Sequence, residues 1–134
     1  MEAITNEAML KEVERTRQHI IKRAEERMAE FMADAQEDFC NFFHWYAGDM
    51  YELKMKHEYF SLMPEIKEDA DIEGVKKQFS MRIKNIEHEL INSSAFGSCT
   101  NEIVNIEHRL KMDAKRAIRE SLKNMAWKLE YPTR

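Results

Sequence analysis

Residues 10–46 read LKEVERTRQHIIKRAEERMAEFMADAQEDFCNFFHWY, and this stretch decides the fold. Apolar or small side chains recur in it at close to the helical period, which places them on one face of an α-helix. These side chains are Leu10, Val13, Ile20, Ala24, Met28, Phe31, Ala35, Phe39, Phe42 and Tyr46. Thr5 can cap the first turn, and Glu7 is placed favourably against the helix dipole. The sequence therefore predicts a long amphipathic helix that begins after Thr5.

The same pattern continues beyond Gly48, because Met50, Leu53 and Phe60 follow in nearly the same phase. The predicted helix covers about residues 6–62, either as one piece or kinked near Gly48. A straight helix of that length would measure roughly 80 Å, whereas a domain of this size has a radius of gyration of about 14 Å. We therefore expect either a bend at Gly48 or a second subunit over the exposed part of the stripe, and we favour oligomerisation.

The rest of the chain predicts two more helices. Pro64 and the acidic residues 65–71 indicate a connection, after which a helix runs over about 72–92. Small residues at 93–98 indicate a loop, and a third helix over about 99–130 follows. We expect this third helix to bury Ile103, Ile106, Leu110, Ala114, Ala117, Met125 and Leu129. The fold class is therefore all-α: one domain over residues 1–134, an antiparallel helical bundle with coiled-coil-like packing and a C-terminal helical hairpin.

Composition supports a helical protein and bears on its location. The chain has only three Gly and two Pro, and it has no apolar run near the length of about 20 residues that a membrane-spanning helix needs. No secretory signal is visible at the first residues, and Cys40 and Cys99 lie far apart without a disulfide framework. We expect a cytoplasmic protein without membrane contact.

Charge is unevenly distributed along the chain. Residues 1–75 carry 9 basic and 18 acidic side chains, whereas residues 109–134 carry 8 and 3. Part of the basic excess forms a stripe opposite the expected buried face of the last helix, at Arg109, Lys115, Arg116, Arg119 and Lys123. Such a stripe suits phosphate groups or an acidic partner, but the pI near 5.8 favours a solvated face. Binding to nucleic acid is therefore the alternative function.

An aromatic run is the most unusual feature of the sequence. Its members are Phe39, Phe42, Phe43, Trp45, Tyr46 and Tyr51. On one helix, side chains at such close positions point around most of the circumference, so they cannot all enter one core. They either fill a thick core where helices meet or form a protein interface, where aromatic residues are enriched. We assign partner binding to Phe42, Phe43, Trp45, Tyr46 and Tyr51.

Motifs for chemistry are weak. Glu37, Cys40 and His44 have a spacing that would place three metal ligands on one helical face, but a fourth ligand is missing, and a structural role is favoured. Cys99 follows a glycine near an expected helix N-terminus, yet His108 is too far along the helix to act as its base. Phosphate-binding loops, nucleophile elbows and zinc-protease motifs are missing, and no histidine has the Glu-x-x-His spacing of di-iron bundles. The sequence therefore predicts no catalytic residue, cofactor or metal.

These observations favour a small helical interaction protein over an enzyme. We expect it to bind another protein as an adaptor, inhibitor or assembly factor in a regulatory role, and to form a homo-oligomer. The expectation rests on the long amphipathic helix and the surplus of aromatic side chains.

Overall fold

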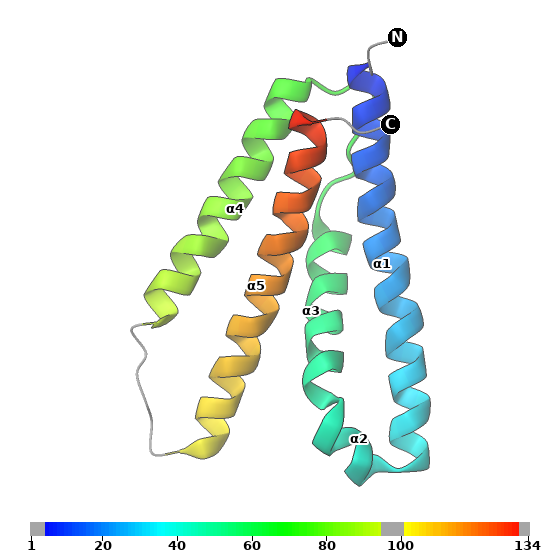
Figure 1. Ribbon diagram of the computed structural model, residues 1–134, viewed down its shortest axis with the longest axis vertical. Helices are drawn as coiled ribbons and strands as arrows, with labels where there is room; N and C mark the ends of the chain where they lie inside the picture. Colours follow the sequence, from blue (N-terminus) through cyan, green and yellow to red (C-terminus); the bar gives the residue numbers. More distant parts are fainter. Residues whose placement is uncertain (1–4, 95–100, 132–134) are drawn as a thin grey trace.

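The computed structural model describes residues 5–94 and 101–131, and its regular structure is entirely helical within those ranges. The helices are α1 (Asn6–Glu37), α2 (Phe39–Trp45), α3 (Ala47–Leu62), α4 (Ile72–Ser94) and α5 (Glu102–Glu130). Figure 1 shows α1 descending, α2 forming the turn, α3 returning, and α4 and α5 forming a second hairpin. The predicted all-α antiparallel bundle with a long N-terminal helix and a C-terminal hairpin is confirmed.

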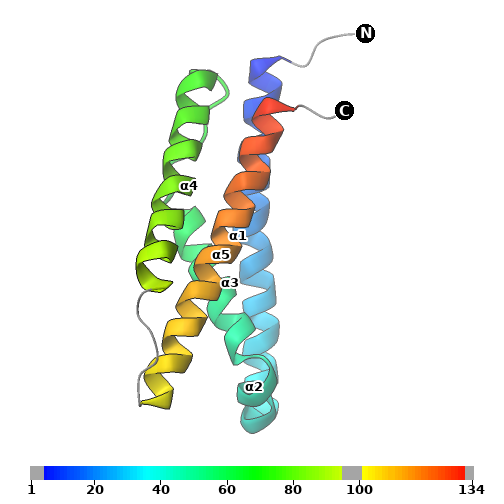
Figure 2. The same cartoon turned by 60° about the vertical axis from the view of Figure 1, so that its left-hand side comes forward.

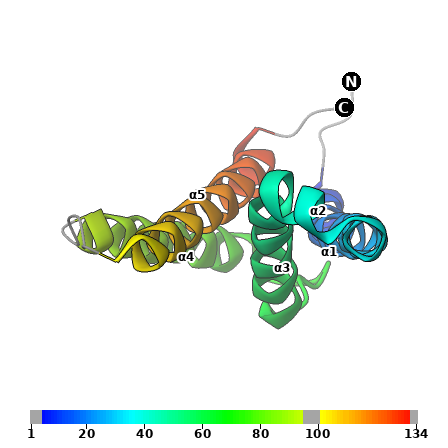
Figure 3. The ribbon, with the colours of Figure 1, turned by 90° about the horizontal axis from the view of Figure 1, so that it is seen from below.

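Helix α5 holds the two hairpins together. It packs against α3, α4 and α1, whereas α4 packs chiefly against α5. Figure 1 shows α5 between α4 and α3, Figure 2 shows α4 and α5 side by side from a second angle, and Figure 3 shows the helices from below. We call the end of the bundle that contains α2 and the start of α5 the lower end, as drawn in Figure 1.

The predicted helix over 6–62 is divided at two places. Tyr46, close to the predicted kink at Gly48, separates α2 from α3. The first break, at Asp38, was not predicted, and there the backbone is extended with φ −147° and ψ 91°. The Asp38 side chain accepts a hydrogen bond from the Asn41 N–H at 3.1 Å and so caps α2. An aspartate of this kind competes with the helical backbone for hydrogen bonds, which explains why the helix ends here.

Gly48 has a packing role inside α3. A Cβ atom at this position would lie 3.2 Å from Cδ2 of Leu110, which is closer than ordinary van der Waals contact. The glycine therefore allows α3 and α5 to approach each other near the lower end of the bundle.

The core follows most of the predicted apolar stripes. Its largest fully buried side chains are Phe60, Phe79, Leu10, Leu122, Met125, Leu129 and Val13. The predicted buried face of the last helix was partly wrong, because Ile103 and Ile106 are 75% and 49% exposed. In α5 the buried positions include Ile118 and Leu122. The buried face of α5 is therefore rotated about the helix axis, from the predicted position of Ala117 toward that of Ile118.

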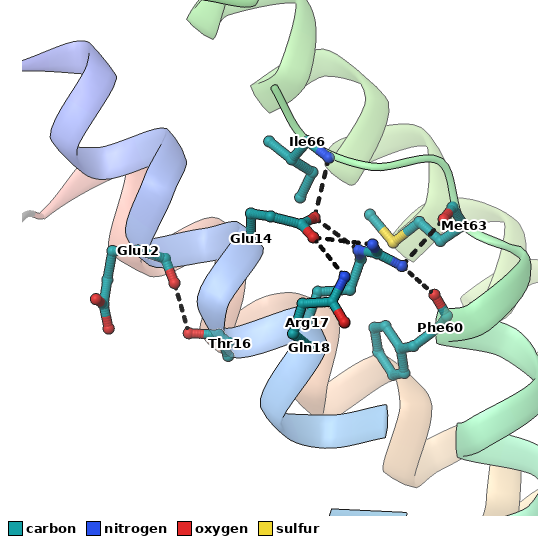
Figure 4. Close-up of polar contacts among 8 residues, drawn as sticks. All are labelled: Glu12, Glu14, Thr16, Arg17, Gln18, Phe60, Met63 and Ile66. Carbon is teal, nitrogen blue, oxygen red and sulfur yellow. Dashed lines mark hydrogen bonds and ion pairs between the residues drawn. The ribbon is translucent and has the colours of Figure 1, made fainter. Parts of the chain in front are cut away.

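A buried arginine fixes the end of α3 to α1 (Figure 4). Arg17 is 5% exposed, and its Nη1 atom donates to the carbonyl oxygens of Phe60 and Met63 at 2.7 and 3.2 Å. Its Nε and Nη2 atoms donate to the two carboxylate oxygens of Glu14 at 2.7 and 2.9 Å. Arg17 therefore satisfies carbonyl groups that the last turn of α3 leaves without helical partners.

Glu14 extends the same network to the connection that follows α3. Its carboxylate accepts from the backbone N–H of Ile66 at 3.0 Å and from Nε2 of Gln18 at 2.8 Å. Burial opposes ionisation of Glu14, but the hydrogen bonds from Arg17, Ile66 and Gln18 outweigh it and lower the pKa of the carboxyl group. The Glu14 carboxylate in turn raises the pKa of Arg17. The pair is therefore ionised at neutral pH.

Removal of the Arg17 guanidinium should destabilise the whole bundle. We expect Arg17→Met to lower the free energy of unfolding by about 3–5 kcal/mol, because it leaves a buried carboxylate and backbone carbonyls without partners. Arg17→Lys should recover only part of this loss, since lysine cannot form the two-pronged contact. Urea unfolding followed by circular dichroism measures both variants, with exposed Arg15→Met as the control. Equal stability of Arg17→Met and the control would contradict this role.

The lowered pKa of Glu14 predicts loss of stability in acid. Its folded-state value lies below the ordinary value of 4.5, so its contribution is fully present above about pH 4.5 and is lost as the pH falls through the folded value. We therefore expect Glu14→Gln to be less stable than the wild type at pH 7. The difference should shrink as the pH falls below about 4.5 and through the lower folded-state value. Urea unfolding at a series of pH values measures this, and a difference independent of pH would contradict it.

Candidate functional site

Three aromatic side chains project from α2 at the lower end of the bundle. Phe39, Phe43 and Trp45 are 63%, 67% and 66% exposed, and we call them the aromatic tip. Figure 1 places α2 at the turn between α1 and α3, far from the two described ends of the chain. Large aromatic side chains are usually mostly buried, so three exposed ones on one seven-residue helix are unusual. By helical spacing, Phe39 and Phe43 lie on one flank of α2 and Trp45 lies on the other.

The tip is anchored by aromatic contacts behind it. Phe42, which is 7% exposed, lies with its ring centroid 6.2 Å from that of Phe31 on α1. The Phe31 ring also lies 5.6 Å from Tyr46 and has the Arg27 guanidinium 4.8 Å from its centroid. These contacts fasten α2 to the end of α1 and hold its outer face toward solvent.

The exposed rings are supported by their neighbours. Phe39 and Phe43 stack with centroids 6.1 Å apart and an interplanar angle of 26°. Trp45 meets the His44 ring edge-on at 4.5 Å. The thiol of Cys40 is free and exposed on the same helix. Within the aromatic tip, Phe39 and Phe43 therefore support each other, whereas Trp45 is supported by His44.

The predicted partner-binding residues are only partly brought together. Phe43 and Trp45 are on the tip, and Tyr46 beside it is 39% exposed. Phe42 instead belongs to the buried anchor, and half-buried Tyr51 lies on α3, where it lines a groove between α3 and α4. The prediction that these rings cannot share one core is confirmed. Phe39 was left out of the predicted set, although its spacing of four residues from Phe43 places the two on one helical face.

The basic residues of α5 face carboxylates. Lys115 lies 3.4 Å from a carboxylate oxygen of Glu89, and Lys123 lies 3.4 Å from one of Glu87. Both glutamates belong to α4, so these two lysines help to join α4 to α5 and do not form a free cationic face.

The other members of the predicted basic stripe are also mostly compensated. Arg116 lies 3.0 Å from Asp113, and Arg119 lies 3.4 Å from Glu120. Arg109 is exposed near the start of α5. A continuous track for phosphate groups would need several cations directed together toward solvent. Local carboxylates reduce the suitability of α5 for that purpose.

The candidate metal ligands do not share one helix. Glu37 is the last residue of α1, whereas Cys40 and His44 lie on α2 beyond the break at Asp38. In residues 5–94 and 101–131, no group of three histidine, cysteine or acidic side chains is arranged to hold a metal ion. Cys99 lies outside the described residues. No helix in the described part of the chain is long and apolar enough to cross a bilayer.

Comparison with known proteins assigns no family to the chain. No protein-family model, curated protein or solved structure matches it. The proposed function therefore rests on the exposure, contacts and charges of the side chains.

The break that creates α2 should depend on the cap at Asp38. We expect Asp38→Ala to lower the free energy of unfolding by about 0.5–2 kcal/mol, because the Asn41 N–H loses its side-chain acceptor. Asp34→Ala, an exposed aspartate one turn earlier in α1, is the matched control and should change stability less. Urea midpoints of the two variants test this. A larger loss in the Asp34 variant would show that the cap is unimportant.

Proposed function

We propose that the protein is a small helical protein–protein interaction module and that the aromatic tip is its contact surface. The observation that carries this proposal is the exposure of Phe39, Phe43 and Trp45 on an anchored helix. Burial of their exposed area against a partner would contribute on the order of 10 kcal/mol before the costs of association. That gain is similar in size to the cost of association, so contacts around the aromatic tip must add to it.

Polar side chains accompany the aromatic tip. Asp38 and Asp49 lie beside the aromatic residues in sequence and supply polar groups. An apolar centre with a polar rim is the usual anatomy of a protein interface.

The partner is either a second copy of this chain or a different protein, and an adaptor, an inhibitor and an assembly factor all fit such a module. The fold removes one reason for expecting a homo-oligomer, since the chain reverses at Asp38 and no 80 Å helix overhangs the domain. Nucleic-acid binding has less support than protein binding, because Lys115, Lys123 and Arg116 lie beside carboxylates.

The test replaces the tip and leaves the fold in place. We expect Phe43→Ser combined with Trp45→Ser to abolish complex formation, because both side chains are exposed and their loss removes apolar contact area. Light scattering over a range of micromolar concentrations measures self-association. A quantitative affinity capture with nuclease treatment measures binding to other proteins, and circular dichroism checks the fold.

The matched control is Trp127→Ser, which changes a tryptophan that is 50% exposed on α5, away from α2. Supporting results are a complex, or a set of captured proteins, that the tip variant loses and the Trp127 variant keeps. If both variants bind equally, or if wild-type binding is lost on nuclease treatment, the proposal is wrong.

A further inference from the structure

A groove lies between α3 and α4, with α5 as its floor. It has a volume of about 580 Å³ and is separate from the aromatic tip. Its apolar surface comes from Met55 and Leu62 on α3, Ile86 on α4, and Ala114 and Ile118 on α5. A volume of this size falls within the range of about 300–1,000 Å³ that is usual for small-molecule sites.

The groove follows from the way the helices pack. α3 and α4 both pack against α5, and the small side chain of Ala114, 2% exposed, forms part of the floor between them. Along α5 the lining runs from Lys111 to Ile118, a rise of about 10 Å. On α3 it runs from Tyr51 to Leu62, a rise of about 16 Å. An extended alkyl chain between these two lengths fits along the groove.

One cation in the groove lacks an acidic partner. The lining holds the cations Arg82, Lys111 and Lys115 and the carboxylates of Glu58 and Glu89. Lys111 lies 2.8 Å from Glu107, and Lys115 lies 3.4 Å from Glu89. Arg82 has no carboxylate of the described residues within ion-pair distance, and its hydrogen-bond partner is the hydroxyl group of Tyr59 at 3.3 Å.

Tyr59 also orients the Arg82 guanidinium. The Cζ atom of Arg82 lies 5.7 Å from the centroid of the Tyr59 ring, and Leu62 borders the groove one turn further along α3. A guanidinium carries five N–H donors, of which the Tyr59 hydroxyl engages one. Arg82 therefore offers donors at one end of an apolar surface.

We propose that this groove binds a small amphipathic carboxylate, with its alkyl chain over Ala114 and Ile118 and its carboxylate on Arg82. A single cation without an acidic partner, at one end of an apolar groove, matches a ligand with one negative charge at one end. Exposed Glu58 in the same lining disfavours ligands with further negative charge. The site is independent of the proposed protein-binding function.

Calorimetric titration with decanoate tests the proposal, with decanol and decylamine as probes of the same chain length. We expect decanoate to bind most tightly and Arg82→Gln to weaken it by about tenfold or more, because a charge-assisted hydrogen bond is lost. The same substitution should leave decanol binding nearly unchanged. Lys77→Gln, which removes an exposed cation of α4 outside the groove, is the matched control and should bind decanoate as the wild type does.

Two further readouts keep the outcome clear. Methyl resonances of Ile86 and Ile118 should shift on addition of decanoate, and circular dichroism should show that Arg82→Gln is folded. Equal affinity of the wild type and Arg82→Gln for decanoate, or shifts confined to α2, would overturn the proposal. A third result would also overturn it: the wild type is a dimer, Arg82→Gln dissociates this dimer, and decanoate does not. The groove would then be an interface between two copies of the chain.

Discussion

The buried contact between Arg17 and Glu14 is the interaction on which the bundle depends. It joins α1 to the last turn of α3 and to the start of the connection at Ile66. An arginine in a helical core is unfavourable unless all of its charge and most of its donors are matched. Here a carboxylate and two backbone carbonyls supply the match, so the polar groups that end α3 are satisfied inside the protein. This contact orients the first hairpin, against which α5 packs.

Polar side chains define the chain reversals, while apolar side chains hold the helices together. Asp38 ends α1 and caps α2, and Asn101 caps α5 by accepting from the N–H groups of Ile103 and Val104. Each cap satisfies amides that a helix start leaves without partners. The apolar stripes then decide which faces meet. The fold therefore combines local hydrogen bonds that set the helix ends with burial that sets the packing.

The sequence was sufficient for the fold class, and it was insufficient where one polar side chain outweighed the periodic pattern. The stripe through Leu10, Val13 and Ile20 predicted α1, but it gave no weight to Arg17, which occupies the same face and is buried. Its position between Val13 and Ile20, three residues after an acidic side chain, was the available signal. Likewise, the apolar stripe continued through Asp38 without a change of phase. The sequence pattern therefore did not distinguish a chain reversal at Asp38 from a straight helix. On α5, contacts with α3 and α4 determine which face is buried. Periodicity alone could not distinguish the predicted face from one rotated to the next residue.

The exposure of the aromatic tip follows from the length of α2. A helix of seven residues between two longer helices can turn only one narrow face toward the bundle, and Phe42 occupies that face. Phe39 and Phe43 lie on one flank of that face and Trp45 lies on the other, so all three stay exposed in the described part of the chain. Phe39 also contacts the anchor, because its ring centroid lies 6.4 Å from that of Phe42. Polar residues in place of Phe43 and Trp45 would give a more soluble turn. The exposed rings of Phe43 and Trp45 therefore contribute to the surface of α2 more than to the closure of the hairpin, which is the physical reason for proposing that this end of the bundle contacts another protein.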